Sequence, residues 1–405
     1  MTQRPDAGSP VARKAVRSDH ARILIASFAA YCVANVSGWI LPDIVNEFVT
    51  VNRLTASQAG FVGTVELAAL AIFSIVLARF ARGVSFLAIA VTGTLVAIVC
   101  TVLSVFASSH GLLLVLRTVT GLGEGAALMV ATAALASFPD PDRAYGQMNV
   151  INTLYGATLI FSLPVLRDYV GAHVAFPMLL LSLVVLAPLV LLMPRRLALD
   201  VPLNTPAGGA FHHHDISRRI WVLAGCIFLI AMNSSAIWSF MILLGTRAGL
   251  GEDAAIQAVA VVALVSASGS LLATLQGTAF GRLWPCIASV VVMTACIVTL
   301  CLNSNPVAFR ILSAALVAAL YYLIPYFMGY AAADDDTGRG AALVGGVFLL
   351  TVALSPYTSG LLIQHFGFGA LALLAVATNA VAIVGIAWFD RDLRRHPTPD
   401  NILHN

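Results

Sequence analysis

Long runs of apolar residues alternate with short polar connections along nearly the whole chain. A membrane-spanning helix needs about 20 mostly apolar residues, and twelve runs are long enough. Their length, and the absence of strict alternation between apolar and polar residues, favour helices over the strands of a barrel. The predicted spans of the first half are Ile23–Leu41, Ala59–Ala78, Val84–Phe106, Gly111–Ala136, Gln147–Leu166 and Val174–Leu192. Those of the second half are Ile220–Leu244, Ala254–Leu275, Trp284–Leu302, Val307–Tyr330, Ala341–Ile363 and Ala370–Trp388.

The one long polar stretch, Pro194–Arg219, separates the first six spans from the last six. It contains proline, glycine and asparagine, which is typical of a linker. The predicted division is a cytoplasmic tail 1–22, a six-helix bundle 23–193, a linker 194–219, a second six-helix bundle 220–389 and a cytoplasmic tail 390–405. The other connections are too short to hold a soluble catalytic domain.

The distribution of Lys and Arg predicts the orientation of the chain. With the N-terminus in the cytoplasm, 17 of the 22 cations lie on the cytoplasmic side, four lie on the opposite side, and Arg117 lies within a span. The first twenty residues are polar and basic, unlike a cleavable signal. We therefore expect a multi-pass protein of the cytoplasmic (inner) membrane with both termini in the cytoplasm.

Composition agrees with this interpretation. Only 10% of the residues are charged and 60% are hydrophobic, whereas a soluble domain carries roughly 25% charged residues. The six cysteines lie in apolar runs without metal-ligand spacing, and the run His212–Asp215 lies in the linker, where a solvated segment is expected. No phosphate loop, nucleophile elbow or dinucleotide fingerprint is present. No metal, cofactor or nucleic-acid partner is expected.

The two halves show weak internal similarity at an offset near 198 residues. Paired segments in the same order suggest two related six-helix bundles. The pairs are Asn35–Trp39 with Asn233–Trp238, Gln58 with Gln257, and Leu166–Gly171 with Leu362–Gly367.

The stretch Leu116–Gly125 resembles the fourth-helix motif of the major facilitator superfamily, an Arg followed four residues later by Gly-x-Gly. Pro356–Gly367 is similar to the end of the eleventh helix in that family. The resemblance implies an all-α membrane protein of twelve helices in two pseudo-symmetric bundles. It also implies alternating access to a central site lined mainly by helices 1, 4, 7 and 10.

Two stretches depart from the family pattern. The loop after the second helix, Leu77–Gly83, lacks the expected Asp, so the usual charge-based latch on the cytoplasmic side is not expected. The fifth span, within Tyr155–Pro164, lacks the Gly-Pro pair of drug antiporters.

Three ionisable residues fall deep in the spans: Glu66, Arg117 and Glu124. Such residues are costly in a bilayer, by roughly 2.5–3.5 kcal/mol each, and they persist where they face a partner or a cavity. Arg117 and Glu124 lie two turns apart on one helix face. We predict Glu66 or Glu124 as the proton-coupling carboxylate, and Arg117 as its partner or as an anchor for an anionic substrate. A purely structural pairing is the alternative.

Polar and aromatic residues on the expected cavity helices are the predicted substrate contacts. Several recur every four residues and so share a helix face. The alternative is that they form interhelical hydrogen bonds or lie at the membrane interface. The candidates are Tyr31, Asn35, Trp39, Asn152, Tyr155, Asn233, Trp238, Tyr322 and Tyr326.

The sequence therefore predicts a secondary active transporter of a small polar or anionic organic solute, coupled to protons and acting as a monomer in the lipid bilayer. Uptake is favoured over efflux because the antiporter signature is absent. Drug or metabolite efflux is the alternative within transport, and a non-transporting membrane sensor is the alternative of another class. An intramembrane enzyme is disfavoured, because no nucleophile or metal motif accompanies the two glutamates.

Overall fold

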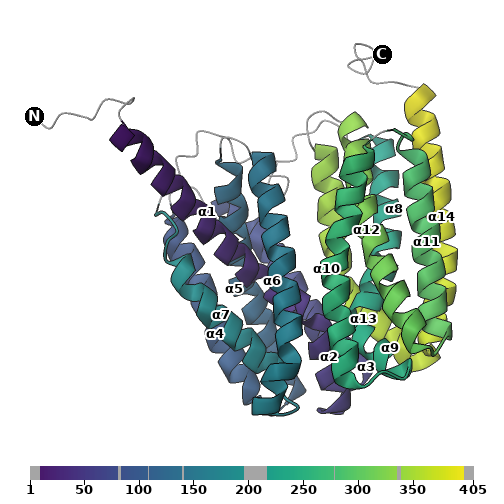
Figure 1. Cartoon of the computed structure of the whole chain (residues 1–405), viewed down its shortest axis with the longest axis horizontal. Coiled ribbons are helices and arrows are strands. Elements are labelled where there is room, and N and C mark those ends of the chain that lie inside the picture. The colour runs from purple at the N-terminus through teal and green to yellow at the C-terminus, as the bar shows by residue number, and fades with distance from the viewer. Residues whose placement is uncertain are drawn as a thin grey trace, which may run out of the picture.

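The computed structural model describes residues 10–80, 84–107, 109–138, 141–195, 217–277, 279–334 and 339–395. Within these ranges every regular element is a helix, as predicted (Figure 1). The helices of the N-terminal half are α1 (Pro10–Trp39), α2 (Leu41–Thr50), α3 (Ala56–Phe80), α4 (Phe86–Val105), α5 (His110–Ala136), α6 (Pro141–Val170) and α7 (Ala175–Val190). Those of the C-terminal half are α8 (Arg218–Ser239), α9 (Met241–Arg247), α10 (Glu252–Gln276), α11 (Leu283–Leu302), α12 (Pro306–Asp334), α13 (Arg339–Phe366) and α14 (Phe368–Arg395).

The predicted number of spans agrees with these helices. Eleven described segments are long and apolar enough to cross a bilayer, and α7 is a shorter apolar helix. Together they match the twelve predicted runs in order. The protein is thus a multi-pass membrane protein. Most of the predicted linker (196–216) and the chain ends (1–9 and 396–405) lie outside the described residues, whereas α1 already begins at Pro10.

The helices gather into two groups, with α4 to α7 on one side and α8 to α14 on the other (Figure 1). The long helix α3 lies at the junction and packs against both α5 and α13. The start of α1 and the end of α14 lie at the same end of the molecule (Figure 1). We call the opposite end, where α2, α6 and α9 end and α10 begins, the distal end.

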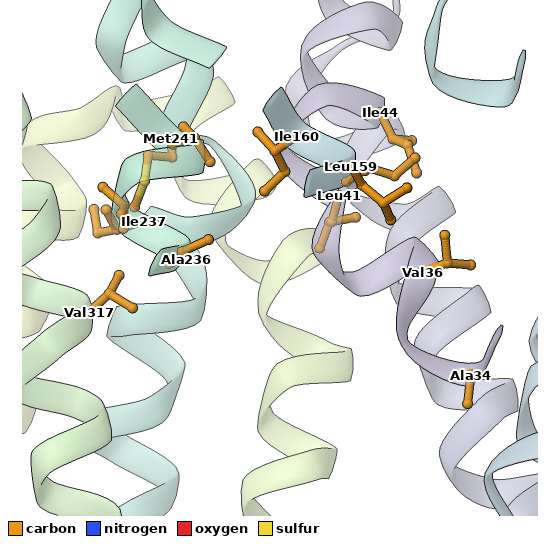
Figure 2. Packing of buried hydrophobic residues seen from close by; sticks show 14 of the residues in the cluster. Ala34, Val36, Leu41, Ile44, Leu159, Ile160, Ala236, Ile237, Met241 and Val317 are labelled. Atoms are coloured by element: carbon orange, nitrogen blue, oxygen red, sulfur yellow. The ribbon is translucent and has the colours of Figure 1, made fainter. Parts of the chain in front are cut away.

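The structure adds a helix, α2, after the predicted end of the first span at Leu41, and it interrupts the predicted seventh span, Ile220–Leu244. The first breaks at Ile40, between α1 and α2, and the seventh breaks at Phe240, between α8 and α9. Pro42 explains the first break, because proline has no N–H to donate to the carbonyl four residues earlier, which is that of Gly38. No proline lies at the second break. Figure 2 shows this region, with Leu41 and Ile44 of α2 on one side and Ile237 and Met241 at the α8–α9 break on the other.

The ends of α6 and α13 support the predicted relation between the halves. Gly171 and Gly367 follow these helices with φ of 81° and 73°. Each donates its N–H to the carbonyl four residues earlier, that of Arg167 and that of Ile363. This is the left-handed helix cap that glycine favours. The two segments that are similar in sequence therefore adopt the same local structure.

Helices α3 and α13 join the halves at their distal ends through small residues. A Cβ on Gly60 would overlap the carbonyl oxygen of Pro356, and a Cβ on Gly360 would overlap that of Ala56. Phe61 and Tyr357 pack beside them with ring centroids 4.9 Å apart. Glycine thus permits the backbones to touch, as small residues do at membrane helix interfaces.

We predict that Gly60→Leu lowers the thermal stability of the detergent-solubilised protein, because the new side chain must push α3 away from Pro356. Overpacking of this kind costs about 1–3 kcal/mol. Gly225→Leu is the matched control, since nothing lies within 4 Å of its Cβ position in α8. Melting curves recorded by tryptophan fluorescence compare the two variants. Equal melting temperatures would contradict a tight α3–α13 contact.

Candidate solute and proton site

The structure brings Glu66, Arg117 and Glu124 into one cluster inside the N-terminal half. Arg117 forms two charged hydrogen bonds with Glu66, from Nε to Oε2 at 3.0 Å and from Nη2 to Oε1. Ser37 accepts a hydrogen bond from Arg117 Nη2 at 3.2 Å and donates one to Glu124 Oε1 at 2.6 Å. The three ionisable side chains are 0–2% exposed. They are therefore shielded from solvent; Arg117 and Glu66 bind each other directly, and Ser37 links Arg117 to Glu124.

Backbone packing explains why Glu66 reaches Arg117. A Cβ on Gly121, one turn after Arg117, would overlap the carbonyl oxygen of Glu66 itself. Only glycine lets α5 lie this close to α3 at that level. The rest of the guanidinium contacts Thr101 of α4 at 3.4 Å and lies over the ring of Phe176 of α7, 5.4 Å from its centroid.

Glu124 is the less satisfied of the two carboxyl groups. Its Oε1 accepts the Ser37 hydroxyl, but its Oε2 has no hydrogen-bond partner although it is buried. The cluster holds one guanidinium and two carboxyls, so one proton on a carboxyl makes it electrically neutral. Buried charge without a partner is strongly unfavourable. Sequence spacing placed Arg117 and Glu124 on one face, but Ser37, their bridge, was not among the predicted residues.

Trp39 and Trp238 meet across the two halves, close to the two helix breaks. Their ring centroids are 6.1 Å apart in an edge-to-face arrangement. Trp238 Nε1 donates to the Gly38 carbonyl at 3.1 Å, the acceptor that Pro42 leaves free. Trp39 Nε1 donates to Asn152 Oδ1 of α6 at 3.2 Å. Three predicted residues from three helices thus form one contact group.

The other predicted residues of the N-terminal half form hydrogen bonds within their own half. Asn35 donates its side-chain N–H to the Tyr31 carbonyl at 2.8 Å, one turn back in α1. Tyr155 forms a hydrogen bond with Ser182 of α7. Tyr31, Asn35 and Tyr155 are all partly exposed.

The predicted residues of the C-terminal half, apart from Trp238, face neighbouring helices. Asn233 donates to Thr378 Oγ1 at 2.8 Å and to Asn379 Oδ1 at 3.1 Å, both on α14. Tyr322 and Tyr326 donate to Gln276 Oε1 at 2.7 Å and to the Gly277 carbonyl at 3.1 Å, at the end of α10. The structure does not bring these three residues to the Trp39–Trp238 contact.

Sequence reasoning missed a second charged group, at the distal end. Asp43 and Glu47 of α2 are 1% and 4% exposed, although they follow the predicted end of the first span. Glu47 accepts the Ala175 N–H at 2.9 Å and lies 3.2 Å from His173 Nδ1, which accounts for both of its oxygens. The four-residue spacing of the two acids directly after Pro42 could have indicated that the helix continues.

Comparisons with known proteins identify the fold. A sequence model described as Major Facilitator Superfamily matches residues 223–403. A mutant of the nucleoside transporter NupG is 11% identical, with a TM-score of 0.69, covering 92% of this chain and 99% of that chain. A bacterial homologue of the human lysosomal transporter Spinster, inward-facing and unoccupied, is 17% identical with a TM-score of 0.66, covering 92% and 96%. A search of the curated proteins finds no match.

Residues 223–403 match the model of the major facilitator superfamily, and 92% of the chain has the fold of the two solved transporters. The TM-scores and coverage establish the shared fold, whereas the low identities leave the solute open.

The protein also has a groove of about 480 Å³ between α6, α7 and α10. Its exposed apolar residues include Phe161, Val165 and Leu181. Three hydroxyl-bearing residues line it: Thr158 and Ser162 donate to carbonyls of their own helix, and Tyr169 is exposed. In a bilayer such an apolar surface faces lipid, and it offers little for recognition of a polar solute.

We predict that Ser37→Ala destabilises the protein more than Ser27→Ala, the matched control on the same helix. Ser37 bridges two charged groups, whereas buried Ser27 only donates to the Ile23 carbonyl of α1. Leaving buried polar groups unsatisfied costs about 1–3 kcal/mol. Thermal unfolding in detergent measures the difference. An equal loss in both variants would show that Ser37 does not support the cluster.

Proposed function

We propose that this protein is a secondary transporter that moves a small polar organic solute across the cytoplasmic membrane by alternating access, with a proton carried on Glu124. Uptake by symport is the proposed direction. Both termini are proposed to lie in the cytoplasm, in keeping with the distribution of cations along the sequence.

The proposal rests on the hydrogen bonding of Glu124, in which Oε1 has a partner and buried Oε2 has none. A second buried carboxyl, that of Glu66, already takes two donors of Arg117, so Glu124 is left with a single hydroxyl donor. A protonated Glu124 removes the excess negative charge, and an ionised Glu124 requires a rearrangement that supplies a partner or water. Protonation is thereby linked to conformation.

The position of Ser37 connects this cluster to the contact between the halves. Ser37 and Gly38 are consecutive residues: the first donates to Glu124 and the second accepts from Trp238 of the other half. A change in the bonding of Glu124 therefore acts on the segment of α1 that holds the C-terminal half. This is a physical route from proton binding to movement of one half relative to the other.

The same geometry narrows the solute class. The guanidinium of Arg117 is fully buried, and its donors are engaged by Glu66, Ser37 and Thr101. We therefore assign it to the cluster rather than to an anionic solute, and we propose an uncharged polar solute. Trp39, Asn152 and Trp238 are proposed to exchange their mutual contacts for contacts with that solute.

Proteoliposomes containing the purified protein test the proposal. An inward proton gradient is applied in the presence of a panel of sugars, nucleosides, amino acids, organic acids and cationic dyes. Glu124→Gln, which mimics the protonated group, should retain solute exchange within about twofold and lose gradient-driven accumulation by tenfold or more. Asp390→Asn is the matched control, a carboxylate in the other half that is 7% exposed.

The outcomes separate the alternatives. Accumulation that persists in Glu124→Gln and is lost in Glu66→Gln would assign the proton-carrying role to Glu66 instead of Glu124. Solute movement without protons, unchanged in both variants, would indicate a uniporter or exchanger. Proton-driven movement of dyes out of the vesicle lumen would indicate efflux, and binding without flux would indicate a sensor.

A further inference from the structure

A charged group at the distal end joins the two halves through one cation. Arg167 of α6 lies 3.2 Å from Glu252 Oε1 and 3.1 Å from Asp253 Oδ1, both in the first turn of α10. The same guanidinium lies 3.5 Å from Asp43 Oδ1 of α2, in its own half. Asn46 of α2 adds a hydrogen bond to Glu252 Oε1 at 2.6 Å. One arginine is therefore shared between an acid of its own half and two acids of the other.

The three acids differ sharply in their surroundings. The side chain of Asp43 is 2% exposed, and neither of its oxygens has a hydrogen-bond partner. Glu252 and Asp253 are 44% and 63% exposed at the side chain. They also lie at the start of α10, where the helix dipole favours negative charge. Separation from Arg167 would thus leave Asp43 as a buried, unpaired charge, whereas Glu252 and Asp253 would remain hydrated.

We infer that Arg167 holds the two halves together at the distal end. When the halves part there, Arg167 stays bound to Asp43 and releases Glu252 and Asp253; we call this arginine the clasp. The inference rests on the alternating access proposed above, and it names the residue that holds the distal end closed. Because Asp43 is buried while Glu252 and Asp253 are exposed to water, Arg167 remains with Asp43 when the cluster separates. The halves therefore separate between α6 and α10, because that separation leaves no buried charge unpaired.

The Trp39–Trp238 contact lies further from the distal end than Arg167 and joins the two halves through aromatic rings rather than charged groups. The clasp is exposed to salt through its two acids, whereas the ring contact is not charged. The two layers should therefore respond differently to ionic strength, since screening weakens the interactions of exposed charges.

The test measures the distance between spin labels at the distal end, on cysteines introduced at Asn52 and Ser304. These residues are exposed and belong to different halves. The six native cysteines are buried, and a sample without introduced cysteines measures any background labelling. In reconstituted protein, Arg167→Gln should raise the ratio of long to short distances about fivefold or more. Arg167→Lys should restore most of the closed population.

Two further variants test where the cluster divides. Glu252→Gln combined with Asp253→Asn should open the distal end as Arg167→Gln does, and so should high salt. Asp43→Asn should not open it, because Arg167 is then held only by the acids of the other half. Arg247→Gln is the control at the same end, since its guanidinium contacts Phe368 within one half.

An unchanged distance distribution in both Arg167→Gln and the double acid variant would overturn the clasp. Opening in Asp43→Asn, or failure of Arg167→Lys to restore closure, would also overturn it. The distance measurement needs no solute. It can therefore support the clasp when no solute moves, or overturn it when proton-driven transport is observed.

Discussion

The buried guanidinium of Arg117 connects five helices of the N-terminal half. It bonds to Glu66 of α3, Ser37 of α1 and Thr101 of α4, and it lies over Phe176 of α7 while belonging to α5. An arginine in an apolar interior must have all of its donors engaged. The requirement fixes how these helices pack, and it also places Glu124 beside a hydroxyl that Arg117 already uses. Structural support and the proposed proton chemistry therefore share one set of atoms.

The two halves have different polar interiors in the described residues. At mid-span the C-terminal half has a neutral network in which Asn233 donates to Asn379 and Asn379 donates to Thr294. Its buried acids, Asp334 and Asp390, lie near the end that carries the termini. Amides and hydroxyls satisfy one another without a net charge, so this network has no reason to change when a proton binds. The difference explains why the proposed coupling is assigned to the N-terminal half.

Pro42 shows how one residue links local structure to the contact between the halves. Its missing N–H frees the Gly38 carbonyl, and the indole of Trp238 uses that acceptor. The break also turns α2 so that Asp43 and Asn46 reach Arg167 and Glu252. Both distal layers, the ring contact and the charged clasp, therefore depend on the interruption of the first span.

The sequence by itself determined the apolar spans and their division into two related sets, and it placed Glu66, Arg117 and Glu124 inside those spans, because length and hydropathy identify the segments that can cross a membrane. It also predicted the resemblance of the Leu166–Gly171 and Leu362–Gly367 segments, which both end in a left-handed glycine. Only the tertiary structure decided that Arg117 pairs with Glu66, that Asn233 faces α14 and that Arg167 bridges the halves. The physical reason is that apolar residues surround these helices on both their lipid-facing and core-facing sides. Periodicity therefore carries little information on how each helix is rotated about its axis, and packing against neighbours distant in sequence sets that rotation.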